Sequence, residues 1–218
     1  MRSEADPHAA TPIVRHGAPL EHAAAVAVMV HGRGARAASI LTLADALDRP
    51  DVAYLAPEAA GGTWYPSSFL APIEQNEPFL TSALAKLRSV VELIDREGVA
   101  RSRVLLLGFS QGACLTLEFA ARAAGRWGGI AGLSGGLIGP AGTPRDYPGR
   151  FEGTPIFLGC STVDGHVPAT RVEESAAVLG RMGAEVDLRL YPGIGHLVND
   201  DEIVAVRAMI DRILVNRA

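Results

Sequence analysis

The chain has 218 residues, of which 48% are hydrophobic, and a formal net charge of −4. This length suits one domain with a substantial apolar core. The basic residues are scattered rather than clustered, which argues against nucleic acid or an acidic membrane surface as a partner and leaves a small, roughly neutral substrate as the expected ligand.

Residues 1–24 are predicted to form an N-terminal extension that packs on a single catalytic domain, residues 25–218. The opening segment is charged and lacks the apolar stretch of a secretion signal, and the apolar run at 23–30 is too short to span a bilayer. Cys114 and Cys160 both fall in predicted buried elements, where reduced, packed thiols are expected. We therefore expect a cytoplasmic protein without a stable membrane anchor.

Apolar runs rich in valine, leucine and isoleucine predict six buried strands. Apolar residues at helical spacing predict three helices. The first runs from residue 80 to a stop at Gly98, the second from residue 170 to a stop at Gly183, and the last begins near Asp201. Strands that alternate with helices favour a mostly parallel central sheet covered by helices on both faces. Two segments, 61–78 and 137–154, fit neither period and are predicted as long loops, either functional or ordinary connections. The predicted strands are Ala25–Val30, Val52–Leu55, Val104–Leu107, Gly129–Leu133, Ile156–Leu158 and Val186–Leu190.

The turn after the strand at 104–107 reads Gly108-Phe109-Ser110-Gln111-Gly112. A serine held in a strained conformation between a strand and a helix leaves no room for side chains two residues away on either side, which explains both glycines. The setting predicts Ser110 as a nucleophile exposed at the carboxyl edge of the sheet, rather than as a simple helix cap.

A serine hydroxyl needs a base to take its proton, and histidine is the usual one. Four of the six histidines precede the serine, in the extension or near the first strand. Of the two that follow it, His196 lies on a glycine-hinged loop before the last helix and is the predicted base, while His166 is expected in a solvated turn. Asp164, which follows the strand at 156–158, is the predicted carboxylate partner, because Asp200 and Asp201 are better explained as helix caps.

The turn after the first strand, "HGRGA" at 31–35, is predicted to complete the site. Its glycines allow the backbone to approach closely, so that the amides of Arg33 and Gln111 could point at one developing oxyanion. The Arg33 side chain either guides an anionic substrate group or lies in solvent, and we favour solvent.

Together, "HGRGA", "GFSQG", "VDGHVP" and "YPGIGH" resemble motifs of the phospholipase/carboxylesterase family, small α/β-hydrolases that include acyl-protein thioesterases. The resemblance implies an α/β-hydrolase fold without a separate cap domain, and a catalytic triad of Ser110, Asp164 and His196. Arg33 and Ala35 depart from the thioesterase branch, which shows an apolar residue and an aspartate there. By the same likeness Trp64 and Tyr65, with Phe69 nearby, are predicted to line the substrate pocket, although the pair could instead pin their loop to the sheet.

The expected activity is therefore a serine carboxylesterase acting on small-molecule esters of small to medium acyl groups, through an acyl-enzyme. An acyl thioesterase or a lysophospholipase would use the same machinery, and a non-catalytic module that binds an apolar ligand would keep the same fold. The histidines and cysteines lack metal-site spacing, and no dinucleotide motif follows a strand, so we expect neither metal nor cofactor. The sequence is compatible with a monomer or a homodimer.

Overall fold

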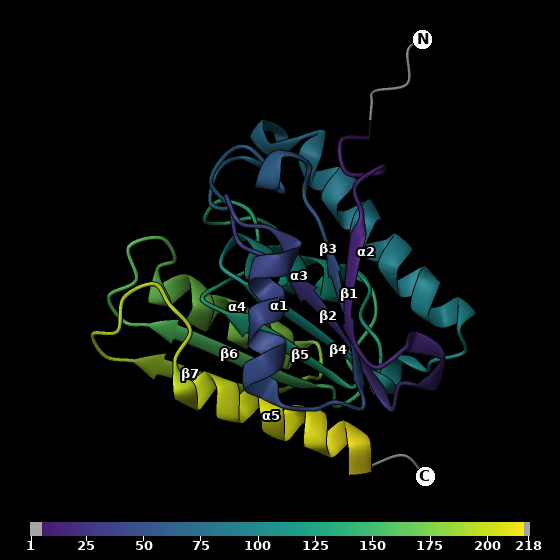
Figure 1. Cartoon of the computed structure of the whole chain (residues 1–218). Coiled ribbons are helices and arrows are strands. Elements are labelled where there is room, and N and C mark those ends of the chain that lie inside the picture. The colour runs from purple at the N-terminus through teal and green to yellow at the C-terminus, as the bar shows by residue number, and fades with distance from the viewer. Residues whose placement is uncertain (1–5, 216–218) are drawn as a thin grey trace.

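A seven-stranded sheet forms the centre of the protein in a computed structural model that describes residues 6–215. Its strand order is β1-β3-β2-β4-β5-β6-β7, and every neighbouring pair is parallel except β1 with β3 (Figure 1). The carboxyl ends of the six parallel strands therefore meet at one edge. The strands are β1 (Ile13–Gly17), β2 (Ala25–Val30), β3 (Val52–Pro57), β4 (Val104–Phe109), β5 (Gly129–Leu133), β6 (Pro155–Ser161) and β7 (Glu185–Tyr191).

Within residues 6–215, five α-helices cover both faces of the sheet, as the alternating pattern predicted. Alternate residues of β2 show how the two faces are separated. Val26 and Val28 belong to the core shared with α2, α3 and α4, whereas Ala27 and Met29 belong to the core shared with α1 and α5. The helices are α1 (Ala37–Leu47), α2 (Phe79–Arg96), α3 (Gln111–Arg122), α4 (Ala169–Arg181) and α5 (Asp200–Val215), and short 3₁₀ turns lie at Leu20–His22, Ala60–Gly62, Ile73–Asn76 and Arg101–Arg103.

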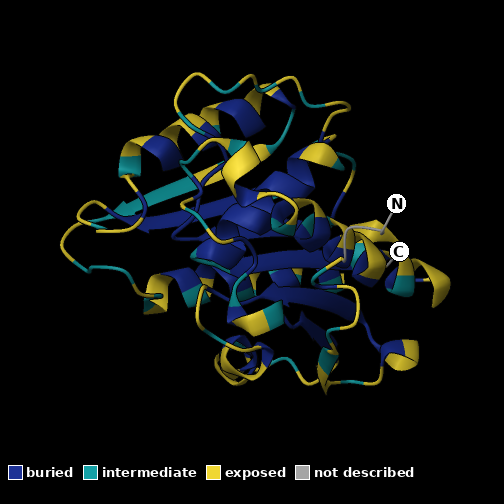
Figure 2. Cartoon of the chain, turned by 90° about the horizontal axis from the view of Figure 1, so that it is seen from above, coloured by how far each residue is buried: buried dark blue, intermediate teal, exposed yellow. Residues whose placement is uncertain are grey.

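The most buried helix is α3, which begins directly behind Ser110. Every residue from Gln111 to Ala121 is buried, and the centre of the molecule is correspondingly dark in Figure 2. A helix that is buried on all sides has little freedom to move, so its first turn holds the preceding residue, Ser110, in a fixed position.

All six predicted strands are present, but β7 differs from the expectation of full burial. It forms one edge of the sheet, and its residues are only half-buried or exposed. The connection from β5 to β6, residues 134–154, forms no helix and no cap over the sheet edge. Within residues 6–215, no helix combines the length and the apolar character needed to cross a bilayer.

Part of the predicted N-terminal extension is built into the sheet. β1 pairs with β3 along its whole length, and residues 1–5 lie outside the described residues. His8 is fully buried: its Nε2 donates to the Trp64 carbonyl over 2.9 Å, and its Nδ1 accepts from the Ala60 amide over 3.0 Å. Burial lowers the pKa of His8, so the ring is neutral and its two bonds tie this segment to the loop that follows β3.

Candidate active site

Ser110 lies in a sharp turn between the last residue of β4 and the first residue of α3. Its backbone has φ 57° and ψ −121°, a conformation that costs a non-glycine residue about 1–3 kcal/mol. The flanking glycines permit it. A Cβ on Gly108 would lie 2.3 Å from the Gly112 carbonyl oxygen, and a Cβ on Gly112 would lie 2.1 Å from the Val30 carbonyl oxygen. The steric reason predicted for this glycine pair is confirmed.

His196 reaches Ser110 from the loop between β7 and α5. Gly193 and Gly195 in this loop have φ of 74° and 72°, values that favour glycine, and they turn the chain back over the sheet edge. The Nε2 atom of His196 lies 2.8 Å from Ser110 Oγ. Its ring also packs on Phe109, with 5.1 Å between ring centroids, so both the loop and the strand end fix the imidazole.

Asp164 completes the chain of contacts from the loop after β6. Its Oδ2 lies 2.6 Å from His196 Nδ1, and its side chain is fully buried. Its Oδ1 accepts hydrogen bonds from the amides of His166, over 2.8 Å, and Val167, over 3.0 Å.

The charge state of Asp164 follows from these contacts. Burial alone would raise its pKa, but the hydrogen bonds from His196 and from the two amides outweigh burial, so the pKa lies below its usual value. The carboxylate is therefore ionised at neutral pH and accepts the Nδ1 proton of His196. This leaves Nε2 as an acceptor for the Ser110 hydroxyl, which is the tautomer that a general base requires.

The other histidines have different positions. His31 is fully buried at the end of β2, where its Nδ1 donates to the Gly32 carbonyl and its Nε2 accepts from the Ala59 amide. Burial lowers its pKa, so it is a neutral structural residue of the turn. His166 is exposed, and its ring centroid lies 4.7 Å from that of His196.

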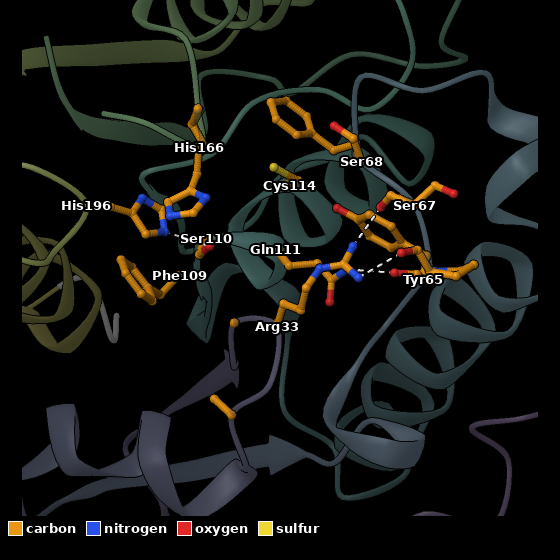
Figure 3. A pocket seen from close by; sticks show the side chains of 15 residues that line it. Arg33, Tyr65, Ser67, Ser68, Phe109, Ser110, Gln111, Cys114, His166 and His196 are labelled. Atoms are coloured by element: carbon orange, nitrogen blue, oxygen red, sulfur yellow. Dashed lines mark hydrogen bonds between the residues drawn. The ribbon is translucent and has the colours of Figure 1, made fainter. Parts of the chain in front are cut away.

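A cavity of about 500 Å³ opens above Ser110 and His196 (Figure 3). Of the residues predicted to form a pocket, Tyr65 and Phe69 line it. Trp64 does not, and this part of the prediction is corrected. Its indole is fully buried between His8 and His31, and its Nε1 donates to the His31 carbonyl over 2.9 Å. Trp64 pins the loop at 61–78 to the sheet, because an indole with one N–H donor is well placed where that donor meets a backbone acceptor.

The side chain of Gln111 also holds this loop, a contact that sequence reasoning missed. Its Oε1 accepts from the Trp64 amide over 2.9 Å, and its Nε2 donates to the Tyr65 carbonyl over 2.8 Å. No local pattern signals this pairing, since the partners are 47 and 46 residues apart.

The amides of Arg33 and Gln111, the predicted oxyanion donors, make no hydrogen bond to any residue between 6 and 215. Gly32 brings the first turn close to the serine, because a Cβ on Gly32 would lie 3.3 Å from Ser110 Cβ. The Arg33 side chain is exposed, as favoured from the sequence, but it is also held by two backbone carbonyls. Its Nη1 donates to the Pro66 carbonyl over 2.8 Å and its Nη2 to the Ser67 carbonyl over 2.6 Å, and the residue lines the cavity.

The two cysteines are free and buried, as predicted. Cys114 lines the cavity, but burial raises the pKa of its thiol to about 12. A thiol that stays protonated at neutral pH is a poor nucleophile, so Cys114 is not a candidate for that role.

Comparisons with known proteins identify the family and the fold. The sequence model of a family described as Phospholipase/Carboxylesterase matches residues 11–214. Acyl-protein thioesterase 1 of Debaryomyces hansenii is 25% identical over 93% of this chain and 97% of its own length. Carboxylesterase SOBER1 of Arabidopsis thaliana is 28% identical over 65% of this chain and 61% of its own.

Among solved structures, a phospholipase/carboxylesterase from Dyadobacter fermentans is 43% identical and has a TM-score of 0.89, covering 92% of this chain and 96% of that one. Esterase PE8, 22% identical with a TM-score of 0.75, has a similar fold. The predicted α/β-hydrolase fold, with a mostly parallel sheet and no separate cap domain, is confirmed.

Proposed function

This chain is a serine hydrolase that belongs to the phospholipase/carboxylesterase family, and from that membership we propose that it hydrolyses carboxylic esters of small to medium acyl groups through Ser110, His196 and Asp164. One observation carries the proposal. A continuous hydrogen-bonded chain runs from the Ser110 hydroxyl through His196 to the buried Asp164 carboxylate, at the floor of an open cavity. These distances are within the range that proton transfer requires.

The first half of the reaction forms an acyl-enzyme. Ser110 Oγ attacks the ester carbonyl carbon while His196 Nε2 takes the hydroxyl proton, and Asp164 stabilises the resulting imidazolium. The oxyanion that forms accepts hydrogen bonds from the amides of Arg33 and Gln111, each contributing about 2.7–4 kcal/mol to transition-state stabilisation. The C–O bond then breaks, and His196 returns its proton to the departing alcohol.

The second half repeats these steps with water. His196 takes a proton from a water molecule as it attacks the acyl carbon, and the same two amides hold the second oxyanion. The carbon–Oγ bond breaks, the acid leaves, and Ser110 regains its proton from His196. No group beyond these residues is needed for the proton and electron balance.

The size of the acyl group follows from the cavity. The cavity of about 500 Å³, which no helix formed by residues 134–154 covers, accommodates a short or medium acyl chain and leaves the alcohol side open. A thioester is the second candidate substrate, because a relative that spans nearly the whole chain is named an acyl-protein thioesterase. Competition between an acyl thioester and the matching oxygen ester measures which is preferred.

The deciding experiment compares the protein with two variants. The wild type should hydrolyse 4-nitrophenyl butyrate and be labelled at one site by a fluorophosphonate. Ser110→Ala should lose both, and His196→Gln should lose nearly all turnover, while both keep the wild-type unfolding temperature. Labelling that persists in Ser110→Ala would contradict the nucleophile, and ligand binding without any turnover in the wild type would favour a non-catalytic module.

A further inference from the structure

An unpaired positive charge lies on the wall of the cavity. Arg33 lines it, but no carboxylate within residues 6–215 forms an ion pair with this guanidinium, and none of the lining residues is acidic. Arg36, three residues later, behaves differently, because it pairs with Glu58 over 3.2 Å outside the cavity. A cation that faces a partly apolar cavity without a counter-ion favours an anionic ligand.

The guanidinium is also held in one orientation. Its bonds to the carbonyls of Pro66 and Ser67 use two of its five N–H donors, and no other described residue accepts a hydrogen bond from the rest. The loop that supplies these carbonyls is itself fixed by Gln111. A pre-oriented guanidinium loses little conformational freedom when it binds a carboxylate, so its remaining donors form a ready site for a planar anion.

The position of Arg33 relative to Ser110 tells which part of the substrate it meets. Figure 3 shows His196 and His166 on one side of Ser110, and Arg33 with Tyr65 and Ser67 on the other. Because His196 returns a proton to the leaving alcohol, the alcohol must lie on the histidine side. The acyl group therefore extends toward Arg33.

A second polar group lines the cavity. The hydroxyl of Tyr65 is buried, and the Cys114 thiol is its only polar neighbour among the described residues that could accept a hydrogen bond from it. Burial raises the pKa of Tyr65 well above its usual value, so it remains a neutral donor. Because a thiol is a weak acceptor, this buried hydroxyl would form a stronger hydrogen bond with an acyl group that carries oxygen atoms.

We propose that Arg33 makes this enzyme selective for acyl groups that end in a carboxylate, so that its preferred substrates are monoesters of short dicarboxylic acids. This inference rests on the proposed esterase function. The competing interpretation is that Arg33 only clamps the loop at 66–67. A clamp would affect anionic and neutral substrates equally, whereas a carboxylate-binding residue changes the ratio between them.

The test measures kcat/KM for matched alkyl monoesters. The anionic series is monoethyl succinate, glutarate and adipate, and each neutral control carries a terminal carboxamide in place of the carboxylate. Alkyl esters are used because, in a 4-nitrophenyl ester, the terminal carboxylate of the same molecule attacks the ester carbonyl and displaces nitrophenolate without an enzyme. The wild type should prefer one anionic ester over its carboxamide by about 10–100-fold, the range of a charged hydrogen bond, and added salt should reduce the preference.

Substitutions assign the preference to one side chain. Arg33→Gln should bring the ratio close to one, and Arg33→Lys should retain part of it, since lysine keeps the charge without the planar fork. Neither change removes the backbone amide of residue 33. Arg36→Gln is the matched control and should leave the ratio unchanged.

The outcomes separate this inference from the proposed function. Equal kcat/KM for carboxylate and carboxamide esters in the wild type would overturn the anion selectivity while leaving the esterase activity in place. The same would follow if Arg33→Gln lowered both values by one common factor. Failure to hydrolyse any ester, including 4-nitrophenyl butyrate, would contradict the proposed function and with it this inference.

Discussion

The Trp64 amide donates a hydrogen bond of 2.9 Å to the side-chain oxygen of Gln111, the residue that directly follows Ser110. The other end of the same side chain donates to the Tyr65 carbonyl over 2.8 Å. Gln111 thus connects the nucleophile turn to the loop that forms one wall of the cavity. The backbone amide of Gln111 is the proposed oxyanion donor and its side chain holds the cavity wall, and the rigid first turn of α3 positions both.

Gln111→Ala should lower both stability and activity. It leaves the Trp64 amide and the Tyr65 carbonyl without partners in a buried place, which costs about 1–3 kcal/mol for each group. The released loop should misplace the cavity wall, and kcat/KM should fall by about 10–100-fold. Urea unfolding and steady-state kinetics measure the two effects.

Gln111→Glu is the informative companion. It can still accept from the Trp64 amide, but an ionised carboxylate cannot donate to the Tyr65 carbonyl and adds negative charge beside the developing oxyanion. Its kcat should therefore fall further than that of Gln111→Ala. Wild-type kinetics in either variant would show that this contact has no part in positioning the loop.

The triad residues could be predicted because each reactive side chain lies at a glycine-rich turn that directly follows a strand. Ser110, Asp164 and His196 each follow an apolar run at a glycine-rich turn, and parallel strands bring their carboxyl ends to one edge whatever their distance in sequence. The structure brings the three side chains into contact, while their catalytic role stays a prediction for kinetics to test.

The parts that were not predicted depend on tertiary contacts. β1 is a short edge strand with weak alternation, and its pairing with β3 has no local signal. The sequence alone does not show whether Trp64 faces the cavity or the core. Its contacts with His8 and His31 place it in the core. The Arg33 side chain is exposed, as expected, but its bonds to the carbonyls of Pro66 and Ser67 were not predicted, because those partners are more than 30 residues away in sequence.

Asp164→Asn should reduce kcat by about four orders of magnitude, as expected when the carboxylate of a triad becomes an amide. The amide can donate to His196 Nδ1 and so favours the wrong imidazole tautomer. Because the pKa of Asp164 lies below its usual value, the wild-type carboxylate stays ionised at mildly acidic pH. Loss of the Asp164 charge should therefore make no contribution to any fall in kcat/KM on mild acidification.

The same shift gives a stability prediction with a definite sign. A depressed pKa in the folded state stabilises the protein above the unfolded value of 3.8, and this contribution is lost as pH falls through the lower folded value. The stability difference between wild type and Asp164→Asn should therefore change only at strongly acidic pH. Urea unfolding at pH 3 and pH 6 checks this, and a difference that changes mainly between pH 6 and pH 8 would contradict it.

Glu202, at the start of α5, should have the opposite dependence. Its Oε2 accepts from the Asn199 amide over 2.9 Å, but its Oε1 is buried without a partner among the described residues. Burial raises its pKa from 4.5 to about 7. As pH rises through this interval the unfolded chain loses the proton first, so wild-type stability should fall, by up to about 3 kcal/mol.

Glu202→Gln should remove this dependence, because glutamine stays neutral and can still accept from the Asn199 amide. Urea unfolding measures the difference in unfolding free energy between the variant and wild type. This difference should favour the variant more strongly at pH 8 than at pH 5. Glu92→Gln, at an exposed position on α2, is the control and should show no such change. Equal pH profiles for wild type and Glu202→Gln would show that the buried carboxyl does not titrate in this range.

Gly112→Ala should prevent normal folding of the nucleophile turn. The new methyl group would lie 2.1 Å from the Val30 carbonyl oxygen, and that oxygen belongs to a strand in the middle of the sheet that cannot move aside. We expect a loss of at least about 3 kcal/mol, or no soluble protein at all. Gly180→Ala is the matched control, because a methyl group there meets nothing within 4 Å and α4 should gain up to about 1 kcal/mol. Thermal and urea unfolding of both variants give the comparison, and a Gly112→Ala protein within 1 kcal/mol of wild type would mean that the turn can relax away from β2.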